Sequence, residues 1–148
     1  MRQHHATLSD VQKYLTGNEL IVTTVRNHWD TVVSWWFLNN RYLPLYRFVD
    51  EYGHDCYARG NKLWWLHDKV DFIMRYETLQ DDLNIVLLSL GLPALELTVE
   101  NVTAGKDRLH YMKYYDAKSF WRVYDRFKEE IDFYGYSEKV AYKDFSRS

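Results

Sequence analysis

The amino-acid sequence predicts a single α/β domain spanning residues 1–148. The expected strands are residues 20–25, which are rich in β-branched side chains, and residues 70–76. Segments with helical periodicity separate and follow these strands, and glycine or proline marks several of their ends. Strands that alternate with helices are typical of an α/β domain with a small parallel sheet, and no repeat or low-complexity linker divides the chain.

The N-terminal half opens with a short helix, expected over residues 7–16. Its start has capping-box spacing, and Gly17 ends its apolar pattern. After the first strand, Asn27 has the position of a cap for a second helix, which Pro44 bends or ends. Residues 45–66 are aromatic and charged without a clean period, which predicts helical turns and loops that cover the sheet.

The C-terminal half contains two helices with clear ends. Thr78 is the expected cap of the first, whose leucines recur at the helical period up to the stop at Gly91 to Pro93. Asp116 opens the last helix, and Gly135 ends it. The tail from about residue 137 is expected to be loosely ordered.

Bulk composition narrows the class of protein. The formal net charge of −2 argues against a general nucleic-acid binder, and the longest apolar run is far too short to span a membrane. The single cysteine, Cys56, excludes an internal disulfide and fits a reducing compartment, and no metal-site spacing occurs. The first residues lack a hydrophobic signal region. We therefore expect a cytoplasmic domain without nucleic-acid, membrane or metal partners.

The junction between the first strand and the second helix carries the main functional signal. Arg26 follows the strand, and Ser34 lies about two turns into the helix. A strand that runs into a helix N-terminus presents unpaired backbone N–H groups and the positive end of the helix dipole. With an arginine and a hydroxyl added, the junction predicts a phosphate pocket. The alternative is a surface arginine and a serine bonded to its own backbone.

Residues 25–36, VRNHWDTVVSWW, resemble the segment V-R-[ND]-P-x-[DE]-R-x-x-S-x-Y of the sulfotransferase family, in particular its carbohydrate-type branch. Two positions depart from that pattern, because His28 replaces a proline and Thr31 replaces a second arginine. Further blocks resemble the family in the same order: HAT at 5–7, DFIMRYETL at 71–79 followed by LGLP, and HYMKYYD at 110–116 followed by DFYGY.

The resemblance implies a P-loop nucleotide-binding-like three-layer fold, truncated at its N-terminal strand and loop. Nothing in the chain matches the family's K-x-G-[TS]-[TS] loop, which wraps the 5′-phosphosulfate of the co-substrate, adenosine 3′-phosphate 5′-phosphosulfate (PAPS). Arg26 and Ser34 then hold the 3′-phosphate. Lys106 and Arg108, in the loop predicted over 94–110, are either further phosphate contacts or a solvated charge cluster. Tyr76 is either a core tyrosine or an adenine contact.

A sulfotransferase also needs a base for the acceptor hydroxyl, and a neutral imidazole suits that task. His4 and His5 precede the arginine motif, where several family branches place such a histidine; the alternative is a frayed terminal pair. The implied function is transfer of sulfate from PAPS to a hydroxyl of a glycan or small acceptor.

Two other functions remain open at this stage. One is a non-catalytic remnant that acts as a nucleotide-binding or assembly module. The other is an aromatic-rich carbohydrate-binding domain, since aromatic residues make up 18% of the chain. A sheet that lacks a strand would also expose an apolar face, so a homo-oligomer is a candidate assembly.

Overall fold

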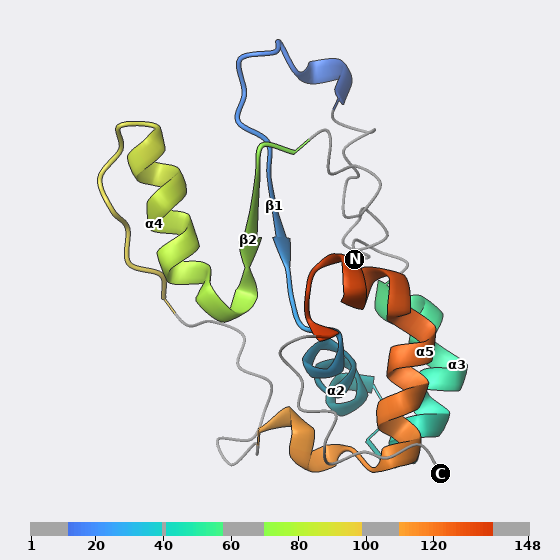
Figure 1. Ribbon diagram of the computed structural model, residues 1–148. Coiled ribbons are helices and arrows are strands. Elements are labelled where there is room, and N and C mark those ends of the chain that lie inside the picture. The colour runs from blue at the N-terminus through green and yellow to red at the C-terminus, as the bar shows by residue number, and fades with distance from the viewer. Residues whose placement is uncertain (1–11, 40, 58–69, 99–109, 138–148) are drawn as a thin grey trace.

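The structure, a computed structural model, describes residues 12–39, 41–57, 70–98 and 110–137. These residues form an α/β arrangement with a two-stranded parallel sheet and four α-helices. Figure 1 shows three of the helices gathered at one end of the strands, with the fourth beside the sheet. The elements, with η for a 3-10 helix, are η1 (Gln12–Tyr14), β1 (Val22–Val25), α2 (His28–Asn39), α3 (Leu45–Tyr57), β2 (Phe72–Arg75), η3 (Tyr76–Thr78), α4 (Leu79–Ser89), η4 (Tyr111–Tyr114) and α5 (Ala117–Phe133).

The two expected strands pair with each other in parallel. Their register places Val25 opposite Arg75 at the last step of the pairing. Asp71 closes the other end, because the N–H of Ile21 donates to its side chain and its own N–H donates to the carbonyl of Ile21, each at 2.8 Å. Parallel neighbours need a crossover connection, and here the chain passes through α2 and α3 between the strands. Both strands therefore end at the same edge of the sheet.

The core lies among α2, α3 and α5, the three helices grouped in Figure 1. Trp29 is fully buried and stacks on Phe120, with 4.8 Å between the ring centroids. Its indole N–H donates to the carbonyl of Phe120 at 3.2 Å, and the hydroxyl of Tyr115 donates to the carbonyl of Trp29 at 2.9 Å. Phe48 and Val49 complete this core from α3. The large apolar area of these rings is thus removed from water without an unsatisfied indole donor.

Both predicted ends of the last helix are confirmed. The carboxylate of Asp116 accepts the N–H of Ser119 at 2.7 Å, and the N–H of Asp116 donates to the hydroxyl of Ser119, so the two residues form a capping box. At the other end Gly135 has a φ of 68°, and the N–H of Tyr136 donates to the carbonyl of Ile131 at 2.9 Å. This is a Schellman turn, which needs a left-handed residue after the helix.

Thr78 has the predicted cap position directly before α4, but the expected side-chain cap bond is not formed. Its hydroxyl donates instead to Asp82 at 3.1 Å. The same carboxylate oxygen accepts the N–H of Arg75 at 2.6 Å. Asp82 therefore joins the end of β2 to the first turn of α4, and this contact draws the hydroxyl away from the helix N–H groups.

The segment over 45–66, predicted as helical turns and loops, begins with a continuous helix, α3. It starts directly after Pro44, whose carbonyl accepts the N–H of Phe48 at 3.0 Å. Leu45, Phe48 and Val49 are buried at helical spacing, so a period was present but was obscured by the aromatic residues between them. The rest of that segment lies outside the described residues.

The helix predicted over 7–16 falls partly outside the described residues, and the described part differs from it. Only Gln12–Tyr14 form a helix there, a single 3-10 turn, and residues 15–16 are not helical. Glu19 then accepts the N–H groups of Thr16 and Gly17, each at 2.9 Å, so a side-chain turn leads the chain into β1.

α4 lies beside β2 and buries Val86. The chain that follows it runs back along the helix, because Gln80 donates to the carbonyl of Leu95 at 2.7 Å and accepts the N–H of Leu97 at 2.8 Å. Several aliphatic side chains of this helix and its following loop are more than one-third exposed: Ile85, Leu88, Leu90, Leu92, Leu95 and Leu97.

The turn after α5 provides a direct test of this fold. Replacement Gly135→Ala should lower the free energy of unfolding by about 1–2 kcal/mol, because a Cβ disfavours the left-handed conformation even where it meets no neighbouring atom. Urea denaturation followed by circular dichroism measures the change.

The matched control is Gly53→Ala in the interior of α3, where φ is not left-handed and the added Cβ makes ordinary contacts with Arg126 and Val49. That variant should be as stable as the wild type or up to about 1 kcal/mol more stable. Equal destabilisation of both variants would contradict the Schellman turn.

Candidate functional site

The candidate site lies at the edge where both strands end. Arg26 follows the last residue of β1, and Tyr76 follows the last residue of β2, so the parallel pairing brings the two together. The guanidinium of Arg26 lies over the ring of Tyr76, 4.2 Å from the centroid. In open α/β sheets, ligands bind outside the carboxyl ends of the strands, which is the position of this pair.

Arg26 is held in place by an aspartate one turn along α2. Its Nε and Nη2 atoms donate to the same oxygen of Asp30 at 2.8 and 2.7 Å, and the two side chains are 25% and 18% exposed. Tyr76 is 52% exposed, so it is not a core residue. The result is a planar cation fixed between an exposed aromatic face and a carboxylate, accessible to solvent on part of its surface.

Ser34 lies on the same side of α2 as this pair. Asp30 and Ser34 are spaced by four within α2, so they are neighbours in a row on its surface, and Arg26, which precedes the helix, joins this row through its ion pair with Asp30. Ser34 is 8% exposed, so it lies in the packed part of the row. Between the arginine and the serine, the sequence motif therefore spans the turn before α2 and about two turns of the helix.

The N-terminus of α2 differs from the expectation of unpaired N–H groups. The side-chain oxygen of Asn27 accepts the N–H of Trp29 at 3.0 Å and that of Asp30 at 3.3 Å, which confirms Asn27 as the cap. The N–H of Asn27 itself donates to Glu77 at 2.7 Å. The positive end of the α2 dipole is thus already met by an internal carboxylate, so an anion at this edge would depend on the Arg26 guanidinium and would compete there with Asp30.

Glu77 connects this turn to the C-terminal end of α5. Its second oxygen accepts the hydroxyl of Tyr136 at 2.9 Å. Burial, together with the nearby charge of Glu77, raises the pKa of Tyr136 well above its usual range, so the hydroxyl remains a donor. Neither residue was assigned to the site from the sequence, although both stand in blocks that resemble the sulfotransferase family.

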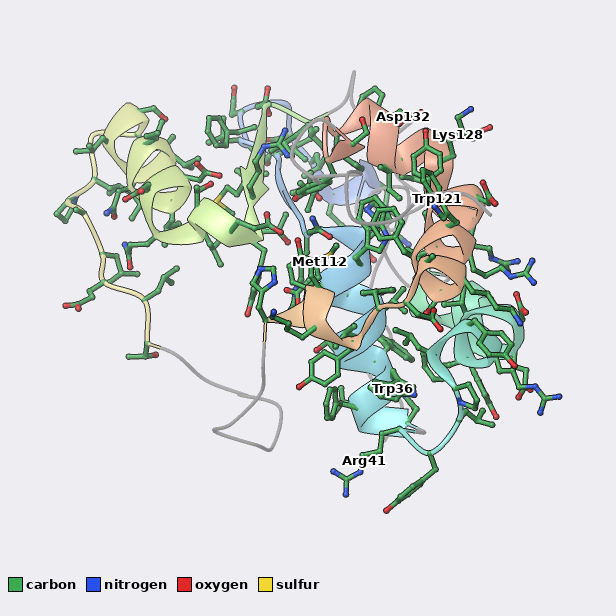
Figure 2. All side chains as sticks on the ribbon, turned by 60° about the horizontal axis from the view of Figure 1, so that its bottom comes forward. Trp36, Arg41, Met112, Trp121, Lys128 and Asp132 are labelled. Atoms are coloured by element: carbon green, nitrogen blue, oxygen red, sulfur yellow. The ribbon has the colours of Figure 1, made fainter. Side chains whose placement is uncertain are left out.

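η4 supplies a further pair of aromatic rings. Burial raises the pKa of Tyr111, and the negative charges of Asp30 and Glu77 raise it further. The ring of His110 packs against Tyr111 with 4.3 Å between centroids, and its Nδ1 accepts the N–H of Met112 at 3.4 Å. Figure 2 shows Met112 beside α2.

His28, at the position where the family has proline, is part of the core. It is 1% exposed, and its ring lies 5.6 Å from that of Phe127, 6.4 Å from Tyr134 and 6.2 Å from Tyr136 between centroids. Burial lowers the pKa of His28 to about 3, so the imidazole is neutral at physiological pH. Its ring packs the start of α2 against α5.

Four of the residues singled out from the sequence cannot be placed. His4, His5, Lys106 and Arg108 lie outside the described residues. Of the others, the structure brings Arg26 and Tyr76 into contact and sets Ser34 further along the same row. Asp30, which forms an ion pair with Arg26, was not assigned to the site from the sequence. Its spacing of four residues from the arginine was the signal that could have identified it.

The described ranges contain no group of three or more histidine, cysteine, aspartate or glutamate side chains arranged to hold a metal ion. In the same ranges, no helix combines the length and the apolar character that crossing a membrane requires.

Comparison of the whole chain with models of protein families, with curated proteins and with solved structures finds no match.

The buried imidazole predicts an acid-sensitive fold. Because the pKa of His28 falls from 6.5 to about 3 on folding, the unfolded chain binds more protons between these values, and stability falls as the pH drops through that window. From pH 7 to pH 5 the loss due to this one group should be about 2 kcal/mol. Replacement His28→Leu should remove that part of the pH dependence, as measured by urea denaturation at both pH values.

A second measurement does not depend on the stability of the variant. In wild-type protein, the imidazole resonances of His28 should not titrate between pH 7 and pH 5. Titration with a midpoint near 6.5 would contradict the burial described above.

Proposed function

We propose that this chain is a sulfotransferase-like domain with a P-loop nucleotide-binding-like fold, which binds PAPS and its product adenosine 3′,5′-bisphosphate. The observation that carries the proposal is the Arg26 guanidinium, held on the half-exposed ring of Tyr76 at the carboxyl edge of the parallel sheet. An arginine fixed in this way offers planar, charge-assisted hydrogen bonds to a phosphate.

The row on α2 suits the 3′-phosphate of such a nucleotide. Arg26 supplies the cation, and Ser34 supplies a hydroxyl further along the same helix face. The ion pair with Asp30 is partly exposed, and such pairs contribute at most about 1 kcal/mol, so a doubly charged phosphate can compete for the guanidinium. Tyr76 supplies a ring face for adenine, and Lys106 and Arg108 would add cationic contacts from their loop.

The proposed reaction transfers SO₃ from the phosphosulfate to an acceptor hydroxyl. A bond forms between the acceptor oxygen and sulfur while the bond from sulfur to the phosphate oxygen breaks, and the acceptor proton passes to a base. His4 or His5 is the proposed base, since a neutral imidazole accepts a proton near physiological pH. The acceptor class is a hydroxyl of a glycan or of a small molecule.

Ligand binding is the first test. Adenosine 3′,5′-bisphosphate should raise the melting temperature of the wild type by several degrees, because a ligand at about 100 times its Kd stabilises the folded state by about 2.7 kcal/mol. Replacement Arg26→Ala should abolish the shift, measured by differential scanning fluorimetry.

The matched control is Arg122→Ala, which removes another arginine–aspartate pair, that of Arg122 with Asp50 at 3.1 Å, away from the strand ends. This control should keep the full shift. An unchanged melting curve of the wild type at millimolar ligand would count against nucleotide binding.

A second candidate function is a non-catalytic nucleotide-binding or assembly module. The observation that favours it is the N-terminus of α2, whose N–H groups are taken by Asn27 and Glu77 instead of being left open for a ligand. Such a module would respond to the bisphosphate through Arg26 but would not transfer sulfate.

Turnover separates the two functions. If the protein is an enzyme, it should transfer labelled sulfate from PAPS, labelled in its sulfate group, to acceptors in a mixture of glycans and small hydroxyl compounds. The double replacement of His4 and His5 by alanine should then reduce the rate by at least about 100-fold, with nucleotide binding unchanged. Binding without any transfer would support the non-catalytic module.

A further inference from the structure

Three segments that are distant in the chain meet at the carboxylate of Glu77: the turn after β1, the end of β2 and the turn after α5. The N–H of Asn27, the residue after Arg26, donates to one oxygen of Glu77 at 2.7 Å, and the hydroxyl of Tyr136 donates to the other at 2.9 Å. Donors from two different elements thus engage both oxygens of one carboxylate. Charge-assisted bonds of this kind are among the stronger ones in proteins, and two of them restrict the carboxylate to one orientation.

Tyr136 is itself held from two sides. Its backbone closes the Schellman turn by donating to the carbonyl of Ile131 at 2.9 Å, and its side chain is buried. The guanidinium of Arg75 lies 5.3 Å from the centroid of its ring and donates to the carbonyl of Tyr134 at 2.9 Å. The position of the hydroxyl is therefore set by the end of α5 and by the last residue of β2.

This arrangement fixes the peptide unit that joins Arg26 to Asn27. With the N–H of that unit held by Glu77, the Cα of Arg26 has a defined place, from which its guanidinium reaches both the ring of Tyr76 and the carboxylate of Asp30. Without the Glu77 contact, the turn between β1 and α2 has one long-range restraint fewer, and the guanidinium loses part of its orientation.

We propose that Glu77 and Tyr136 are positioning residues of the Arg26 site. They hold the turn between β1 and α2 so that the guanidinium is oriented before a phosphate arrives, and they act through Arg26 without touching the ligand. A group oriented in advance loses less entropy on binding, so these residues increase affinity. As far as the ligand is concerned, this inference rests on the proposed nucleotide binding.

The first experiment compares tyrosine-to-phenylalanine variants. Isothermal titration with adenosine 3′,5′-bisphosphate, at a temperature where circular dichroism shows every variant folded, should give Tyr136→Phe a Kd about tenfold weaker than that of the wild type. Tyr124→Phe is the matched control, because it also deletes a tyrosine hydroxyl that donates to a carboxylate, that of Asp132 at 3.3 Å. Its Kd should be unchanged.

The second experiment separates positioning from general stability by conservative rescue. Glu77→Gln keeps an oxygen that can accept the N–H of Asn27. Its new NH₂ group can donate a hydrogen bond to the hydroxyl oxygen of Tyr136, so the Kd should remain within about threefold of the wild type. Glu77→Ala loses both contacts and should bind at least as weakly as Tyr136→Phe. A merely structural role would lower the melting temperature of the variants and leave the Kd of the folded protein unchanged.

A third measurement needs no ligand. The Nε–H of Arg26 is held by Asp30 at 2.8 Å, and its exchange with solvent, followed by NMR, should be faster in Tyr136→Phe and Glu77→Ala than in the wild type and Tyr124→Phe. Unchanged exchange in the folded variants overturns the positioning role, whether or not the nucleotide binds. A wild type that does not bind the nucleotide, combined with faster exchange in the variants, refutes the proposed function but not the positioning.

Discussion

Glu77 accepts hydrogen bonds from the amide of Asn27 and from the hydroxyl of Tyr136, and these two contacts join parts of the chain that are distant in sequence. The turn after β1, the end of β2 and the turn after α5 meet at this one carboxylate. The strands alone could not hold their shared edge in a defined shape, since a two-stranded sheet has little stability of its own. The side chains at the edge owe their arrangement to the helices packed behind it.

The same carboxylate affects the electrostatics of the edge. The positive end of the α2 dipole is met by Glu77, and the guanidinium of Arg26 is met by Asp30, so internal charges are balanced before any ligand is present. In the proposed function, a phosphate would interact mainly with the exposed part of the guanidinium and would compete for it with a partly exposed aspartate.

Much of the candidate site follows from local rules. Adjacent parallel strands bring the residues after them together, which accounts for the contact of Arg26 with Tyr76. A spacing of four along α2 makes Asp30 and Ser34 neighbours on the helix surface. The link to Tyr136 could not be found in this way, because no periodicity relates a residue after the last helix to one after the second strand.

The sequence by itself determined the two strands, the helices α2, α4 and α5 and their order, and it determined those ends that depend on a nearby residue: the cap at Asn27, the capping box at Asp116 and the left-handed turn at Gly135. Only the tertiary structure decided that His28 would be buried and neutral, and that Glu77 would meet Tyr136. The physical reason is the range of the interactions. Caps and turns are made within a few residues, whereas burial and long-range hydrogen bonds depend on which surfaces the packed helices exclude from water.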